Sequence, residues 1–165
     1  MLQDKTIVIT GAASGIGRAT ALLAAKYGAK LALCDLNEEG VAETTQMARE
    51  LGATAASMSV DVAIAEQVEA FMKKASAEFG RIDGAFNNAG VGGTLTRAHM
   101  LTEEQWDQCI NINLKGVWLC IKYEIPHMRG DGGGAIVNMA SVAGLLGFPM
   151  NSVYAASKHG VIGLT

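Results

Sequence analysis

The chain has 165 residues, 50% of them hydrophobic and 18% charged, and its formal net charge is −3. This length fits one domain with a substantial core, and an acidic balance without a run of basic residues argues against a nucleic-acid partner. The sequence contains no uncharged apolar stretch of 18 residues, which a membrane span would need. Charged residues stand near the amino terminus, where a signal peptide would need its apolar region.

Strands and helices are expected to alternate along the chain. Short apolar runs predict five strands, at residues 5–10, 30–35, 53–60, 82–87 and 135–141. Helical spacing and capping residues predict five helices, at residues 16–27, 37–51, 68–79, 102–129 and from 152 onward. A polar loop is expected at 91–101 and a glycine-rich turn at 130–134.

This alternation is the pattern of βαβ units, in which a parallel sheet lies between two helical layers. We therefore predict an α/β fold in which residues 1–165 form a single domain. The helix expected at 102–129 is predicted to have one buried face, formed by Trp106, Ile110, Asn113, Val117 and Ile121.

The segment TGAASGIG connects the first expected strand to the first helix. Gly11, Gly15 and Gly17 let the backbone pass close to a phosphate, and the start of the helix offers free N–H groups to a pyrophosphate. Ser14 and Ile16 belong to the same turn. The spacing differs from the G-x-G-x-x-G of the general dinucleotide-binding fingerprint, and the alternative is a tight structural turn.

Asp35 ends the second expected strand, 18 residues beyond Gly17. A carboxylate there can accept hydrogen bonds from both hydroxyls of an adenosine ribose, and it repels a 2′-phosphate. The glycine segment has no Lys or Arg, and the next residue is Leu36, so nothing obvious would neutralise that phosphate. This pattern favours NAD over NADP. The alternative is that Asp35 supplies a negative charge to the start of the next helix.

Two further segments follow expected strands at the edge where α/β sheets bind ligands. Asp61 and Val62 come after the third strand, and Asn88, Ala89 and Gly90 come after the fourth. Both segments can therefore reach an adenine or a ribose. Each is weak evidence alone, because Asp61 could cap the next helix, and Asn88 and Gly90 could hold a turn together.

Four polar residues are candidates for catalysis: Asn113, Ser141, Tyr154 and Lys158. Tyr154 and Lys158 are four apart, so on a helix their side chains share a face. A cation about 4 Å from a tyrosine stabilises its ionised form, which suits a general base toward an alcohol or a general acid toward a ketone. Ser141 ends the fifth expected strand, where it can hydrogen-bond the reacting oxygen. Asn113 could kink its helix through water, relay protons, or be an ordinary core amide.

Together these residues resemble the short-chain dehydrogenase/reductase family. The resemblance extends over the whole chain and rests on six motifs: TGAASGIG, DV at 61–62, NNAG at 87–90, NINLKG at 111–116, Ser141 and YAASK at 154–158. It implies a Rossmann-type doubly wound sheet of strand order 3-2-1-4-5, from which the C-terminal strands of the family are missing. We therefore expect the N-terminal part of a longer enzyme.

The resemblance also implies a role for each residue. The glycine segment binds the dinucleotide, Asp35 marks a preference for NAD, and Asn113 completes a proton relay. Ser141 positions the substrate carbonyl, Tyr154 is the acid/base, and Lys158 binds the nicotinamide ribose and supports Tyr154, which also contacts the cofactor. The implied reaction is hydride transfer between NAD and a secondary alcohol or ketone. The alternatives are an NAD-binding module or a fragment without turnover of its own.

The remaining expectations concern partners and location. LLGFP at 145–149 suggests an apolar pocket wall, and so a moderately hydrophobic substrate. In the family, the helices at 102–129 and 152–165 usually form the subunit interface, which implies a dimer or tetramer. No His/Cys/Asp cluster has the spacing of a metal site. The three cysteines have no CxxC spacing, which is typical of thiols in the reducing cytoplasm.

Overall fold

Five parallel strands form one sheet of order β3-β2-β1-β4-β5 in the computed structural model, which describes residues 1–128 and 132–165. The strands are β1 (Thr6–Thr10), β2 (Lys30–Asp35), β3 (Ala55–Ser59), β4 (Gly84–Asn87) and β5 (Ala135–Asn138). Each lies within the range predicted for it. The α/β fold and the predicted strand order are confirmed.

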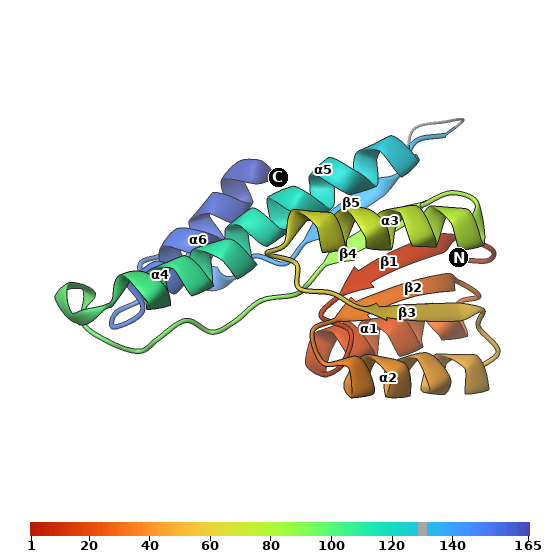
Figure 1. The fold of residues 1–165 in the computed structure, drawn as a ribbon, viewed down its shortest axis with the longest axis horizontal. Coiled ribbons are helices and arrows are strands. Elements are labelled where there is room, and N and C mark those ends of the chain that lie inside the picture. The colour runs from red at the N-terminus through yellow and green to blue at the C-terminus, as the bar shows by residue number, and fades with distance from the viewer. Residues whose placement is uncertain (129–131) are drawn as a thin grey trace.

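Helices cover both faces of this sheet (Figure 1). On one face lie α1 (Gly15–Lys26) and α2 (Glu38–Glu50), and on the other lie α3 (Ala65–Phe79) and α5 (Gly116–Met128). Two further helices, α4 (Glu103–Ile110) and α6 (Ser152–Leu164), pack against each other beside α5. Among the described helices, none has the length and hydropathy that crossing a membrane requires.

The alternation of side chains along the strands divides the core into two clusters. On β1, Val8 packs into the cluster beneath α3 and α5, whereas Ile9 packs into the cluster beneath α1 and α2. On β2, Cys34 belongs to the first cluster and Leu33 to the second. Apolar residues at consecutive positions are therefore buried on opposite faces, as expected of a parallel sheet covered by helices on both sides.

Small residues bring α1 close to the sheet. Its buried positions are Gly17, Ala21, Ala24 and Ala25. The larger apolar residues Ile16 and Leu23 lie on its other face and are exposed. The helix is thus correctly predicted, and its short buried side chains allow its first turn to approach the ends of the strands.

The prediction of a single helix at 102–129 is wrong in one respect. A π-helical segment, η2 (Asn111–Lys115), separates α4 from α5. Such a segment adds one residue to a turn and so rotates the following helix relative to the preceding one. The end expected near residue 129, and the first residues of the turn expected at 130–134, lie outside the described residues.

This break changes which side chains are buried. Asn113 and Val117 are buried as predicted, but Trp106 is 43% exposed. The buried positions on either side of the break are instead Cys109 and Cys120. Two other residues of the predicted face are only half-buried, Ile110 and Ile121.

Candidate functional site

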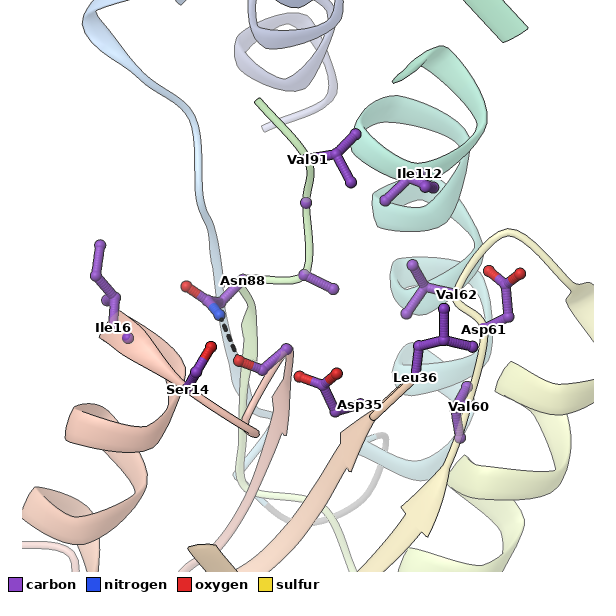
Figure 2. Close-up of a pocket in the computed structure, with 14 residues that line it drawn as sticks. Ser14, Ile16, Asp35, Leu36, Val60, Asp61, Val62, Asn88, Val91 and Ile112 are labelled. Atoms are coloured by element: carbon purple, nitrogen blue, oxygen red, sulfur yellow. Dashed lines mark hydrogen bonds between the residues drawn. The ribbon is translucent and has the colours of Figure 1, made fainter. Parts of the chain in front are cut away.

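A pocket of about 420 Å³ lies at the carboxyl ends of the central strands (Figure 2). Its lining contains eleven of the residues predicted to bind a cofactor: Gly11, Ser14, Gly15, Ile16, Asp35, Leu36, Asp61, Val62, Asn88, Ala89 and Gly90. The pocket thus brings together four segments that are far apart in the sequence.

The glycine turn has no room for side chains on its inner side. Gly11 has a φ of +66°, and a Cβ on Gly17 would overlap the carbonyl oxygen of Gly11. Asn88 fixes this turn from the end of β4, because its Nδ2 donates to the carbonyl oxygens of Thr10 at 3.0 Å and Gly11 at 3.1 Å. One of these bonds is drawn in Figure 2. Asn88 therefore joins the glycine turn to the NNAG segment.

The start of α1 is open toward the pocket. Ser14 precedes the helix, but its side chain does not cap the first N–H groups, and the first turn has no acidic residue. Ser14 and Ile16 lie beside the pocket in Figure 2. Uncapped N–H groups at the positive end of a helix dipole favour an anion such as a phosphate.

Asp35 places a carboxylate on the pocket wall. Its Oδ2 accepts from the backbone N–H of Ala13, and its Oδ1 accepts from that of Asn37, both at 2.9 Å. The residue that caps α2 is Asn37, whose side chain accepts from the backbone N–H of Gly40. Because a carboxylate has about four acceptor positions, Asp35 retains acceptors for a ligand hydroxyl.

Asp61 and Val62 form the wall next to β3. Asp61 Oδ1 accepts from the backbone N–H of Ala63 at 2.9 Å. Helix α3 begins after Ile64 without a side-chain cap, so Asp61 does not cap it. Val62 packs against the start of α5, where a Cβ on Gly116 would lie 2.9 Å from Val62 Cγ2.

Asn113 joins the pocket to the helix that contains Tyr154 and Lys158. Its Oδ1 accepts from the backbone N–H of Val91 at 2.7 Å, and its Nδ2 donates to the carbonyl oxygen of Val91 at 2.9 Å. The same Nδ2 donates to Ser157 Oγ on α6 at 3.2 Å. The buried amide is therefore fully hydrogen-bonded within the protein, and it fixes Val91 in the pocket lining.

Lys158 lies directly behind the pocket. Its Nζ donates to the carbonyl oxygen of Met139 at 2.7 Å and lies 5.7 Å from the centroid of the Tyr154 ring. A Cβ on Gly90, which lines the pocket, would be 3.7 Å from this ammonium, so Lys158 lies next to the pocket wall. Burial lowers the pKa of Lys158 from its ordinary value.

Tyr154 lies at the apolar end of the site. It is half-buried, and its ring meets that of Phe148 edge to face, with centroids 6.5 Å apart. Ser141 lies beyond the end of β5, before the short helix η3 (Val142–Gly144), and its Oγ accepts from the backbone N–H of Ala143 at 3.1 Å. Neither residue lines the 420 Å³ pocket.

Comparison with known proteins identifies the family. The profile of the short chain dehydrogenase family matches residues 5–165. The chain belongs to the short chain dehydrogenase family. Levodione reductase of Leifsonia aquatica is 43% identical over 164 residues, which cover 98% of this chain and 61% of that protein. Cyclohexanol dehydrogenase of Acinetobacter sp. (strain SE19) is 42% identical over 163 residues, which cover 99% of this chain and 65% of that protein.

Two solved structures have the same fold. The crystal structure of levodione reductase matches with a TM-score of 0.96 and 42% identity, over 100% of this chain and 65% of that chain. NAD⁺-bound xylitol dehydrogenase matches with a TM-score of 0.96 and 35% identity, over 99% of this chain and 63% of that chain. This chain therefore spans less than two thirds of the length of these relatives.

Three residues of the pocket lining were not predicted from the sequence. They are Val60, Val91 and Ile112. Val60 directly precedes the DV motif and Val91 directly follows NNAG, so the position of each motif could have indicated that its neighbour lines the pocket. Ile112 belongs to the π-helical segment, whose irregular turn gave no periodic signal. Gly17 does not line the pocket, and a Cβ there would overlap the carbonyl oxygen of Gly11, so its lack of a side chain allows the turn to close. Its contact with a cofactor stays a prediction.

Proposed function

We propose that this chain is the dinucleotide-binding part of an NAD-dependent oxidoreductase, which transfers a hydride between NAD and a secondary alcohol or ketone. The observation that carries this proposal is the pocket in which the carboxylate of Asp35 lies beside the uncapped start of α1. The 35% identical xylitol dehydrogenase was crystallised with NAD⁺, which supports the proposal. Residues 1–165 would then form a single dinucleotide-binding domain.

The lining fits a dinucleotide in three places. The glycine turn and the first N–H groups of α1 would hold the pyrophosphate, since no side chain competes for them. Asp35 would accept from the hydroxyls of the adenosine ribose, with Leu36, Asp61 and Val62 beside the adenine. The NNAG segment, with Lys158 behind Gly90, would contact the nicotinamide ribose.

The chemistry would be shared among four side chains. Tyr154 takes the proton of the alcohol hydroxyl in oxidation and returns it to the ketone oxygen in reduction. The ammonium of Lys158 favours the ionised tyrosine, and Ser141 donates a hydrogen bond to the reacting oxygen. Asn113 is the candidate for completing the proton relay, and its amide ties Val91 to α6. Bound NAD supplies the hydride acceptor.

The residues beside Tyr154 favour a hydrophobic substrate. Large apolar side chains are exposed there: Val142, Leu145, Leu146, Phe148 and Met150. Exposed apolar clusters of this kind are typical of binding surfaces. We infer an alicyclic secondary alcohol as the substrate class, and the 42% identity to cyclohexanol dehydrogenase supports this inference.

A second apolar surface favours a homodimer or homotetramer. A groove of about 490 Å³ runs between α4–α5 and α6, and Trp118 and Leu164 are exposed on it. These are the helices through which the family resemblance implies subunit contact. All three cysteines are free and buried, which supports the expected cytoplasmic location.

Separate calorimetric titrations of NAD and NADP into the 165-residue chain test this function. Saturable NAD binding with at least tenfold weaker NADP binding is expected, followed by NADH formation from cyclohexanol that Tyr154→Phe abolishes. Xylitol, a polar polyol, is the matched substrate and is expected to react more slowly. NAD binding without turnover of any alcohol would favour the module without activity. Binding of neither dinucleotide would overturn the proposal for this chain.

A further inference from the structure

A carboxyl group is fully buried beside the carboxyl ends of β4 and β5. Glu124 on α5 has 0% of its surface exposed. Asn87, the last residue of β4, donates from Nδ2 to Glu124 Oε2 at 3.2 Å and to Asn138 Oδ1 at 3.0 Å. We call these three residues the amide–acid cluster. None of them lines the pocket, and the proposed function assigns no role to any of them.

The cluster contains two acceptors without a donor. Asn87 Oδ1 and Glu124 Oε1 are both buried, and neither has a hydrogen-bond partner among the residues that the structure describes. A proton on Glu124 Oε1 would give the cluster the donor that Asn87 Oδ1 lacks, and the two side chains already meet through Asn87 Nδ2 and Glu124 Oε2. Because an unpaired buried acceptor is costly, the geometry favours a neutral Glu124.

The surroundings of Glu124 also favour its neutral form. The titratable groups that face it are the buried thiols of Cys34 on β2 and Cys120 on α5, and α3 contributes apolar side chains such as Phe71 and Met72. Within residues 1–128 and 132–165, no cationic side chain forms an ion pair or hydrogen bond with Glu124. Burial raises its pKa to about 7, against the lowering effect of the hydrogen bond from Asn87.

The cluster is connected directly to both halves of the candidate site. Asn87 precedes Asn88, which fixes the glycine turn. Asn138 precedes Met139, whose carbonyl oxygen accepts from Lys158 and whose backbone N–H donates to the carbonyl oxygen of Asn87 at 2.9 Å. Each asparagine of the cluster is thus the direct neighbour in sequence of a residue that holds the site together: Asn87 of Asn88, and Asn138 of Met139.

We propose that Glu124, as a neutral acid, is a positioning residue for the dinucleotide site: it holds the carboxyl ends of β4 and β5 at the spacing that Asn88 and Lys158 require. Ionised Glu124 places an unpaired charge in the core and cannot donate to Asn87, so the two strand ends separate more readily. Only the identity of the bound molecule rests on the proposed function, because the positioning is a property of the chain without ligand.

Amide hydrogen exchange of the ligand-free chain tests the positioning. The reporting amides are those of Asn88 and Ala89, which donate to Thr10 Oγ1, and that of Met139. The amides of β1 and β2 are the reference, since a loss of overall stability accelerates both groups equally. Exchange is measured at pH 6 and pH 8 and corrected for the intrinsic effect of pH.

Three variants accompany the wild type: Glu124→Gln, which retains a donor and an acceptor without charge, Glu124→Leu, and Glu78→Gln at an exposed position as control. Glu124→Leu is expected to accelerate the reporting amides at least tenfold relative to the reference. In the wild type and in Glu78→Gln, exchange of the reporting amides is expected to be at least threefold faster at pH 8 than at pH 6. In Glu124→Gln, their exchange is expected to be the same at both pH values. Equal acceleration of all core amides, or the same pH response in Glu124→Gln, would overturn the inference, even if Glu124→Leu fails to fold.

Titration of NAD at the same two pH values separates this inference from the proposed function. The wild type is expected to bind NAD at least threefold more weakly at pH 8 than at pH 6, and Glu124→Gln equally at both. If NAD binds but neither affinity nor exchange responds to Glu124, the positioning inference alone fails. If the exchange results hold and NAD does not bind at either pH, the proposed function alone fails.

Discussion

The ammonium of Lys158 donates a hydrogen bond of 2.7 Å to the carbonyl oxygen of Met139, which joins α6 to the end of β5. Lys158 is only 4% exposed, so removing it from water is costly unless its donors are used. One of its three donors is used here, and the ammonium lies behind Gly90, at the pocket wall. The position of this charge therefore depends on the strand end as well as on the helix.

Lys158→Met tests this placement, since the change keeps an unbranched side chain and removes the charge. NAD affinity is expected to fall at least tenfold, about 1.4 kcal/mol, because the donor toward the nicotinamide ribose is lost. Stability is expected to fall by about 1 kcal/mol, because the carbonyl oxygen of Met139 loses its partner. Calorimetry and thermal unfolding measure the two effects. Lys26→Met, at an exposed lysine, is the control, and equal NAD affinity in both variants would contradict the assignment.

Asp35→Asn tests dinucleotide preference with little change in shape. The NAD-to-NADP affinity ratio is expected to fall at least tenfold, because the charge that repels a 2′-phosphate is removed. Asp35 also accepts from the backbone N–H groups of Ala13 and Asn37, so a stability loss of about 1–2 kcal/mol is expected as well. Parallel titrations of both dinucleotides measure the ratio. Glu39→Gln, in the first turn of α2, should leave it unchanged. An unchanged ratio in Asp35→Asn would argue that another group selects the cofactor.

Local chemistry explains why most of the fold and the pocket lining could be predicted. Each strand is a short apolar run, and the glycine segment stands between the first of them and a helix, so the order of elements follows from sequence alone. Asp35, Asp61 and Asn88 follow strands, and parallel strands bring their carboxyl ends to one edge. Their convergence in the pocket needed no information about side-chain packing.

The break at η2 could not be predicted in this way, because tertiary contacts decide it. Asn113 is hydrogen-bonded to Val91 and Ser157, which are distant in sequence, and the helix inserts a π turn where these contacts form. The predicted helix face is therefore only partly buried: Val117 beyond the break is buried as predicted, whereas Trp106 before it is exposed. The buried residues of α5 are Gly116, Val117, Leu119, Cys120, Glu124 and Met128.

Glu124 was missed for a different reason. An acid on a helix is ordinarily exposed, so Glu124 was not predicted to be buried, although it stands seven residues after Val117 and so on the same side of the helix. On the observed face it is the polar residue of an apolar row, which is the same signal that drew attention to Asn113.

Gly17→Ala tests whether the glycine turn needs its close approach. The added Cβ would overlap the carbonyl oxygen of Gly11 and lie 2.7 Å from Asn88 Nδ2, so the turn must move away from the NNAG segment. Unfolding free energy is expected to fall by about 1–3 kcal/mol, and NAD affinity at least tenfold. Gly163→Ala on α6 is the matched control, because, apart from its chain neighbours and the backbone of its own helix, no described atom lies within 4 Å of its added Cβ. That change should stabilise the chain by about 0.5–1 kcal/mol, since alanine favours a helix. Equal stability of both variants would show that the turn tolerates a side chain.

Stability should depend on pH through Glu124. Burial raises its pKa from an ordinary 4.5 to about 7, so its contribution is fully present below pH 4.5 and is lost as the pH rises through 7. Relative to Glu124→Gln, the wild type should lose about 2 to 3 kcal/mol of unfolding free energy between pH 5 and pH 8. Denaturant unfolding at several pH values measures this difference.

Asp83 provides an internal check on this pH dependence, because its effect has the opposite sign. Burial raises the pKa of Asp83, but hydrogen bonds from Thr6 and Lys5 and the charge of Arg81 outweigh it, so its pKa lies below the usual value. Its contribution is present above pH 4 and lost only as the pH falls further. Asp83→Asn should therefore change stability equally at pH 5 and pH 8, whereas Glu124→Gln should not. A loss between pH 5 and pH 8 that persists in Glu124→Gln would assign the titration to another group, and Glu124 would then be ionised or neutral throughout this range.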